Sequence, residues 1–172
     1  MYKRQPLAPS LFSIIPRDYS FGERDTVFDL EGTFTGVAIC FDIVDDNIVW
    51  AMMDEGADII FAPTNNADFG QTDQSVQQLA IARLRAIETA RSVVNISTVG
   101  TSAIMDPRGV TLDRLPTYTE GYMLRDVPLS QTVTPATVLG RSLETTLVVF
   151  TFSGLFIAFF DPGARQRRRE TH

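Results

Sequence analysis

The chain has 172 residues, a formal net charge of −6 and a sequence pI near 4.7, a balance that argues against a nucleic-acid partner. Its hydrophobic content of 44% and charged content of 21% are those of a globular domain with a core. The single cysteine, Cys40, excludes an intrachain disulfide and a multi-cysteine metal site, and the single histidine is the last residue, His172. We therefore expect no histidine-based triad, no metal site and no cofactor.

Residues 1–26 are expected to be irregular and to contain no signal peptide, because several prolines interrupt them. Strand and helix patterns then follow one another. In chain order we expect strands at 27–30 and 33–39, a helix at 43–55, a strand at 57–62 that ends at Pro63, a helix at 73–91, and strands at 92–98, 101–106 and 121–127. This alternation with a β-rich end predicts an α/β or α+β domain with helices packed on the faces of a sheet.

The clearest helix is the one predicted at 73–91, with Asp73 as its N-cap. Its apolar residues recur at the spacing of a helix with one face on the core. They are Val76, Leu79, Ala80, Leu84, Ile87 and Ala90. Arg85 and Glu88 lie three residues apart on this helix, and we expect them to form a modestly stabilising surface pair.

The run Thr145–Phe160 contains no charged residue, and with its flanks it approaches the roughly 17–25 residues that cross a bilayer. We expect a transmembrane helix at 143–162 in the cell membrane. The basic tail at 163–172 would be cytoplasmic by the positive-inside rule, and residues 1–140 would lie on the extracytoplasmic side. A long buried strand or a core helix is the alternative for this run.

Cys40 ends an apolar, strand-like run, Gly36–Ile39, before the polar segment Asp45–Asn47. A strand that leads into a turn before a helix is a common way to expose a nucleophile. The alternative is a buried cysteine that acts as a small hydrophobe. A free thiol also needs activation, and without a usable histidine its partner must be a carboxylate or a lysine. The only lysine is Lys3, which could equally be a solvated surface charge.

Phe41 and Asp42 follow the cysteine directly, where a helix is expected to begin. Their backbone amides are candidate donors to an oxyanion. The Asp42 carboxylate could orient the lysine, or it could cap the helix or close an Asx turn.

A second group of candidates lies in the loop after the predicted strand at 57–62. Asn65, Asn66 and Phe69 form a candidate substrate loop, because sites in layered α/β domains gather at the carboxyl ends of strands. We expect Asn65 to bond to the backbone of the loop that holds Cys40. Ordinary turn chemistry is the alternative.

Five segments together resemble the nitrilase, or carbon-nitrogen hydrolase, superfamily, and within it the apolipoprotein N-acyltransferase branch. The resemblance runs from about residue 2 to residue 160, and its most specific part is the Gln-Gln-Leu-Ala helix that continues into Arg-Ala-Ile-Glu. The segments are Gly36–Asp42, Gly56–Ile60, Thr64–Gly70, Gln77–Arg91 and Thr98–Gly109.

The resemblance implies a four-layer αββα sandwich with a Glu-Lys-Cys triad, in which Cys40 aligns with the nucleophile and Lys3 with the lysine. It also implies the reaction. A phospholipid donates a fatty acyl group to the cysteine as a thioester, and the amine of a lipoprotein's lipidated N-terminal cysteine then takes it.

The chain departs from this family upstream of and just after Lys3. The family's glutamate and its multi-helix membrane domain lie upstream of the lysine, where this chain has no room for them. The usual Pro-Phe-Gly-Glu after the lysine is replaced by Ala8-Pro9-Ser10-Leu11, and Asp42 stands where the branch often has Glu. We therefore expect residues 1–140 to form a partial nitrilase-like domain, incomplete at its N-terminus, that is inactive or nearly so by itself.

Two alternatives to an acyltransferase remain open. One is a soluble amidase that acts on a small amide. The other is a degenerate remnant or subunit that pairs with a separate chain supplying the glutamate.

Overall fold

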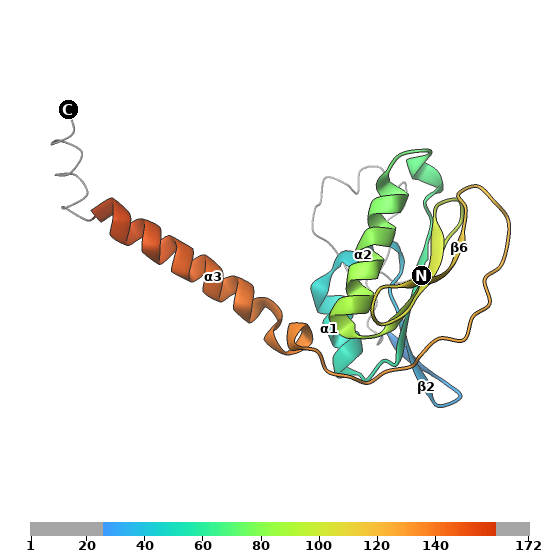
Figure 1. Ribbon diagram of the computed structural model, residues 1–172, viewed down its shortest axis with the longest axis horizontal. Coiled ribbons are helices and arrows are strands. Elements are labelled where there is room, and N and C mark those ends of the chain that lie inside the picture. The colour runs from blue at the N-terminus through green and yellow to red at the C-terminus, as the bar shows by residue number, and fades with distance from the viewer. Residues whose placement is uncertain (1–25, 161–172) are drawn as a thin grey trace, which may run out of the picture. The chain divides into compact units, whose positions relative to one another are not determined.

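The computed structural model describes residues 26–160, without the side chains of Asp68 and Arg141. The segment predicted to be irregular and the basic tail at 163–172 lie outside the described residues. The described chain contains six strands and three α-helices (Figure 1). They are β1 (Val27–Leu30), β2 (Thr33–Val37), α1 (Asp46–Asp54), β3 (Ile59–Thr64), α2 (Gln74–Thr89), β4 (Ser92–Ser97), β5 (Ser102–Met105), β6 (Thr111–Leu115) and α3 (Pro135–Phe160).

The six strands form one sheet in the order of the sequence, from β1 at one edge to β6 at the other. β2, β3 and β4 are parallel, and the remaining neighbours are antiparallel. Because parallel strands end on the same side, the segments that follow β2, β3 and β4 emerge together at one edge of the sheet. The predicted strand–helix alternation and α+β class are confirmed.

Helices α1 and α2 cover one face of the sheet, and the main core lies between them and the strands. Met52 of α1 and Leu79 of α2 pack there with Ile60 and Val93 of the central strands. Small residues of α2, such as Ala82, are fully buried against the sheet, which lets the helix backbone lie close to the strands.

The other face of the sheet has a smaller apolar cluster of Ile59, Val94 and Ile104. Among residues 26–160 no helix of the first compact unit covers this face. The irregular segment 116–134 lies over it, with Met123 and Val127 packed on the cluster. The described part of this unit is therefore one helical layer on one sheet, which corresponds to half of the predicted four-layer sandwich.

The strand predicted at 121–127 is wrong, and β6 at Thr111–Leu115 was not predicted. β6 pairs with β5 through a turn in which Gly109 N–H donates to Asp106 O at 2.9 Å. The sequence of segment 121–127 suggests a strand because it contains Tyr122, Met123, Leu124 and Val127. In the structure Met123 and Val127 pack on the face of the sheet, and the segment does not join it as a strand.

Two predicted boundaries also shift. The helix expected at 43–55 is split into the 3₁₀ helix η2 (Cys40–Val44) and α1, because the Asp45 side chain accepts from Asn47 N–H and caps a new helix. Pro63 does not end β3 but lies within it, opposite Ile96. The β2 pairing stops at Phe61, so one side of β3 is open beyond that point and a missing N–H is tolerated.

The helix α3 consists of two helical pieces, because Gly140 has non-helical backbone angles. Contacts divide the described chain into two compact units between Thr137 and Val138. The piece Ser142–Phe160 has a mean hydropathy of 1.8, and none of it is buried. It is the one helix in the described chain that is long and apolar enough to cross a membrane.

Candidate active site

Cys40 begins the 3₁₀ helix η2, three residues after β2 ends. Its φ is +58°, in the left-handed region that residues with a side chain rarely adopt. The thiol is half-buried, so Cys40 is not simply part of the apolar core. A strained residue in a turn after a parallel strand is a setting in which a nucleophile can be presented.

Asp42 closes the turn around Cys40. Its Oδ2 accepts from Ile39 N–H at 3.1 Å, and its own N–H donates to Ile39 O at 3.1 Å. The carboxylate therefore has the turn-closing role that the sequence left open. Of the two amides expected to face an oxyanion, that of Asp42 is engaged with Ile39, whereas Phe41 N–H makes no hydrogen bond with a described residue.

Helix α2 holds both ends of this turn from the side. Gln78 Nε2 donates to Cys40 O at 2.8 Å. Arg85 Nε donates to Ile43 O at 2.9 Å, and its Nη2 donates to Val44 O at 2.8 Å. Gln78 and Arg85 are seven residues apart and so share one face of α2. Sequence reasoning missed Gln78, although its spacing from Arg85 was a usable signal.

Arg85 is buried, contrary to the expectation of a surface pair. The predicted bond to Glu88 is present at 2.6 Å, but Arg85 also bonds to Asp46 of α1 at 2.6 Å. Burial by itself lowers the pKa of Arg85, but the hydrogen bonds that it donates to Glu88 and Asp46 raise the pKa overall. A doubly paired guanidinium thus ties α2 to α1 and to the cysteine turn.

The loop after β3 lies at the same edge of the sheet. Asn66 is 2% exposed, and its Oδ1 accepts from Thr64 Oγ1 at 3.2 Å. Thr64 Oγ1 also bonds to the Gln78 amide, which links this loop to the Cys40 turn. We expected Asn65 to bond to the backbone of that turn, but its hydrogen-bond partners in the described chain lie elsewhere. Its Oδ1 accepts instead from Ala67 N–H and from Thr98 Oγ1, at 3.1 and 2.8 Å.

The remaining predicted site residues lie apart from these bonds. Phe69 ends a short 3₁₀ helix, η3 (Ala67–Phe69), and is 38% exposed. Phe41 is 61% exposed. Lys3 lies outside the described residues. Among residues 26–160 no group of three or more His, Cys, Asp or Glu side chains could hold a metal ion.

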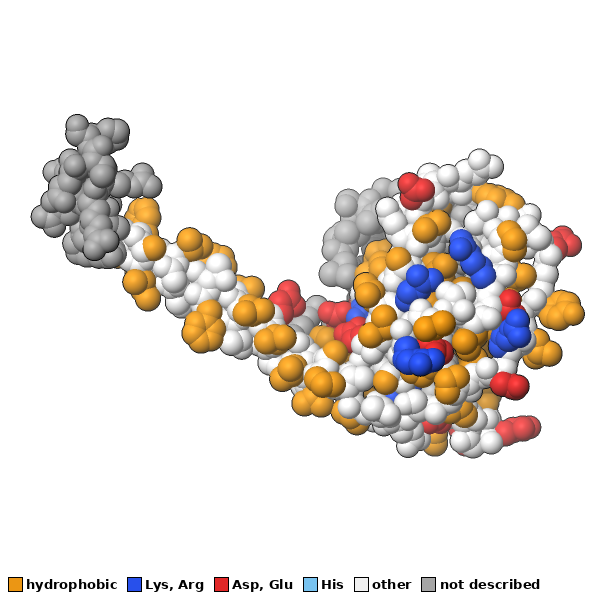
Figure 2. Space-filling view, in the orientation of Figure 1, with side chains coloured by type: hydrophobic (Ala, Val, Ile, Leu, Met, Phe, Trp, Pro, Cys, Tyr) orange, Lys and Arg blue, Asp and Glu red, His pale blue; other side chains and the backbone are white. Residues whose placement is uncertain are grey.

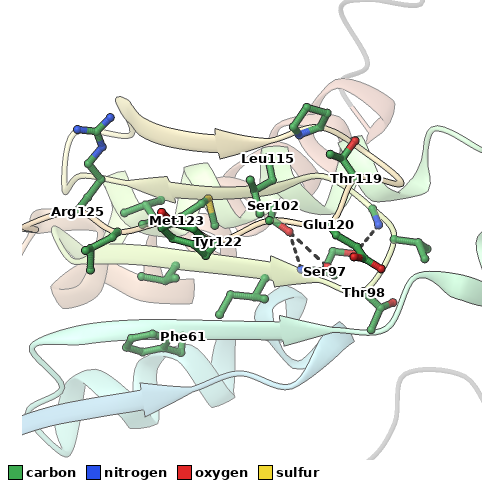
Figure 3. A pocket seen from close by; sticks show the side chains of 18 of the residues that line it. Phe61, Ser97, Thr98, Ser102, Leu115, Thr119, Glu120, Tyr122, Met123 and Arg125 are labelled. Carbon is green, nitrogen blue, oxygen red and sulfur yellow. Dashed lines mark hydrogen bonds between the residues drawn. The ribbon is translucent and has the colours of Figure 1, made fainter.

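A cavity of about 590 Å³ lies on the face of the sheet opposite the helices (Figure 3). Its floor includes Ile59, Phe61 and Val94, and the segment with Tyr122 and Met123 lies over them. Cys40 does not line it. The Cys40 thiol and this cavity are therefore separate features of the described structure.

Comparison with known proteins gives a family and a set of relatives. The model of the family described as carbon-nitrogen hydrolase matches residues 9–134. The apolipoprotein N-acyltransferase of Mycolicibacterium smegmatis is 32% identical over 155 residues, which are 87% of this chain and 26% of the relative. That of Nitrosomonas europaea is 30% identical, over 90% of this chain and 30% of the relative. The chain spans about a quarter of the length of the curated relatives it matches.

The solved structures agree on the fold. An amidase of the nitrilase superfamily from Nesterenkonia superposes with a TM-score of 0.53 at 20% identity, over 67% of this chain and 45% of the amidase. A glutamine-dependent NAD⁺ synthetase from Acinetobacter baumannii gives a TM-score of 0.54, also at 20% identity, over 60% of this chain and 21% of the synthetase. With the family model matching most of its length, the chain belongs to the carbon-nitrogen hydrolase family.

Proposed function

We propose that this chain is the nucleophile-bearing part of an apolipoprotein N-acyltransferase, and that Cys40 carries the acyl group. The observation that supports this most is the strained, half-buried Cys40 at the carboxyl edge of the parallel strands. The relatives from Mycolicibacterium smegmatis and Nitrosomonas europaea are apolipoprotein N-acyltransferases. The Nesterenkonia amidase carries a covalent adduct at its active-site cysteine, which supports a nucleophilic cysteine on this fold.

The proposed reaction has two steps. In the first, the Cys40 thiolate attacks the ester carbonyl of a phospholipid, an S–C bond forms, and the C–O bond to the lysophospholipid breaks. In the second, the free amine of a lipidated N-terminal cysteine attacks the thioester, an amide forms, and the thiol returns. Each tetrahedral intermediate carries a negative oxygen, for which Phe41 N–H is the proposed backbone donor.

The proton transfers need a base, and the resemblance gives that role to a glutamate together with Lys3. No described residue takes that role in our proposal, since the Asp42 carboxylate closes the turn. We propose that these 172 residues alone form the thioester slowly and do not turn over efficiently. No relative described above points to a separate chain that supplies the glutamate, so we do not propose one.

The test mixes the 172-residue protein, held in detergent micelles, with a phospholipid that carries a labelled acyl group. Transfer of the label to the protein is then measured. Because Cys40 is the only cysteine, any label released by neutral hydroxylamine comes from a thioester at that residue. We expect slow labelling that is lost in Cys40→Ser. Rapid turnover onto a lipidated cysteinyl peptide would contradict the proposed inefficiency, and absence of label with both phospholipid and an activated ester would contradict Cys40 as the acyl carrier. Ammonia release from a small amide would instead favour the amidase.

A further inference from the structure

The peptide unit between Cys40 and Phe41 is held from its carbonyl side. Gln78 Nε2 donates to Cys40 O at 2.8 Å, from a residue 38 positions along the chain. A trans peptide is planar, and its C=O and N–H point in opposite directions. The side chain that fixes the Cys40 carbonyl therefore also fixes the direction of Phe41 N–H.

The hydrogen bond from Gln78 acts on a backbone conformation at Cys40 that is unfavourable by itself. Cys40 has a φ of +58°, and the left-handed conformation is unfavourable for a residue with a side chain. A change of Cys40 toward negative φ would rotate the peptide plane and turn Phe41 N–H away. The Gln78 bond opposes that rotation, because the carbonyl would lose its partner.

Gln78 is itself held in place. Its Oε1 and Nε2 lie 3.3 and 3.1 Å from Thr64 Oγ1 at the end of β3, and Thr64 is buried. The neighbouring Gln77 is exposed and has no comparable contact with the turn. The amide of Gln78 is thus fixed between the ends of two parallel strands.

We propose that Gln78 is a positioning residue that aims Phe41 N–H at the oxyanion formed during acyl transfer. The inference rests on the proposed role of Cys40 as acyl carrier. It also has a chemical signature. Attack on an ester carbonyl produces an oxyanion before the leaving group departs, whereas alkylation by iodoacetamide forms the S–C bond as the C–I bond breaks and produces none. Loss of Gln78 should therefore slow acylation and spare alkylation.

The experiment compares the two reactions of the one thiol in the full 172-residue chain. Acylation is followed by release of p-nitrophenolate from a p-nitrophenyl ester, and alkylation by mass after iodoacetamide. Both are run at about pH 9, where hydroxide can remove the thiol proton and no protein base is needed. Gln78→Met keeps the length of the side chain and removes the donor. Gln77→Met is the matched control, and thermal unfolding by circular dichroism checks each variant.

We expect the ratio of acylation to alkylation rates to fall about 10- to 100-fold in Gln78→Met, less than the ~10²–10³ lost with a whole oxyanion donor, and to stay unchanged in Gln77→Met. If Gln78→Met is poorly folded, Gln78→Glu is the variant that tests the proposal. Its carboxylate would repel the Cys40 carbonyl and should lower the ratio of acylation to alkylation rates at least as much as Gln78→Met. A ratio within about twofold of wild type, or an equal fall in both rates, overturns the role of Gln78 but leaves the proposed function of Cys40 standing. A wild-type thiol that is alkylated but never acylated overturns the proposed function as well.

Discussion

Arg85 Nε donates to the carbonyl oxygen of Ile43 at 2.9 Å, across 42 positions of sequence. This bond ties the middle of α2 to the turn that begins at Cys40. Together with the ion pairs to Asp46 and Glu88, it makes Arg85 the point where three segments of the chain meet. The stability of the cysteine turn should therefore depend on this side chain.

Replacement of Arg85 by methionine is expected to destabilise the domain by about 3–5 kcal/mol, because it leaves partly buried carboxylates and backbone carbonyls without a partner. Urea unfolding followed by the fluorescence of the single tryptophan, Trp50 of α1, measures the effect. Arg83→Met is the matched control, since Arg83 is exposed and its one side-chain bond within residues 26–160 is to Thr111 Oγ1. Equal losses in the two variants would contradict the role assigned to Arg85.

Asp106 makes the stability of the domain depend on pH. Burial alone would raise the pKa of its carboxyl, but hydrogen bonds from Val110 N–H and from Arg108 lower it overall. A carboxyl with a lowered pKa in the folded state stabilises the fold above its unfolded pKa and loses that contribution as the pH falls through its folded pKa. We expect Asp106→Asn to be less stable than wild type near neutral pH.

The measurement is the free energy of unfolding of wild type and of Asp106→Asn between about pH 7 and about pH 3. It tests whether the stabilisation by Asp106 is lost as the pH falls. The difference should be largest at the neutral end and should shrink toward the acid end. A difference that stays constant over this range would mean that the ionised carboxylate is not what stabilises the turn.

Gly100 faces the buried Asn66, and a side chain there should be harmful. A Cβ at Gly100 would lie 2.6 Å from Asn66 Nδ2 and 2.9 Å from Ser75 Cβ. We expect Gly100→Ala to cost about 1–3 kcal/mol, the usual range for overpacking, in the same urea assay. Gly36→Ala is the comparison, because its Cβ would meet the flexible end of Met52 at 2.9 Å. A larger loss for Gly36→Ala would reverse this ranking.

The helix Ser142–Phe160 is predicted to hold the chain in a membrane. Its phenylalanines are exposed in the structure, Phe150 by 72% and Phe156 by 65%. An arginine near the centre of a membrane helix costs about 2.5–3.5 kcal/mol, so the double change of both to arginine should release the chain from membranes in a carbonate wash. The same double change to leucine should not. Release of the wild-type chain by the wash would contradict a membrane-spanning helix.

Orientation in the membrane is a separate prediction. Arginines follow the helix within residues 163–172, and basic residues next to a membrane helix favour the cytoplasmic side. A fluorescent protein fused after His172 should therefore fluoresce in bacterial cells, and alkaline phosphatase fused there should be inactive. The opposite pair of results would place the C-terminus outside.

Most of the strands and helices could be predicted because their patterns are local. β3 is mostly apolar, and β4 contains the apolar residues Val93, Val94 and Ile96 and is buried over its first four residues, as expected for parallel strands covered on both faces. β6 was missed because it is a half-exposed edge strand whose sequence includes Asp113 and Arg114. The segment 121–127 has a similar mixture of apolar and charged residues, and the local sequence does not distinguish a segment that covers a sheet from a strand within it.

The faces of α2 were harder to predict for a different reason. Val76, Leu84 and Ile87 fit the helical spacing but are exposed, by 51%, 63% and 50%. Figure 2 shows apolar and arginine side chains mixed on the side of the molecule formed by α2. The buried face instead contains Arg85, because the carbonyls of the cysteine turn need donors. Hydrogen bonds between residues far apart in the sequence cannot be predicted from the spacing of apolar residues along one helix.

The positive φ of Cys40 also has a consequence for substitutions that would remove its thiol. Glycine adopts this backbone geometry without strain, so Cys40→Gly should fold at least as stably as Cys40→Ala although it removes the thiol. Selection for robustness alone would therefore erode the reactive residue rather than preserve it. A cysteine at a position where glycine would fit without strain is what the proposed use of the sulfur predicts.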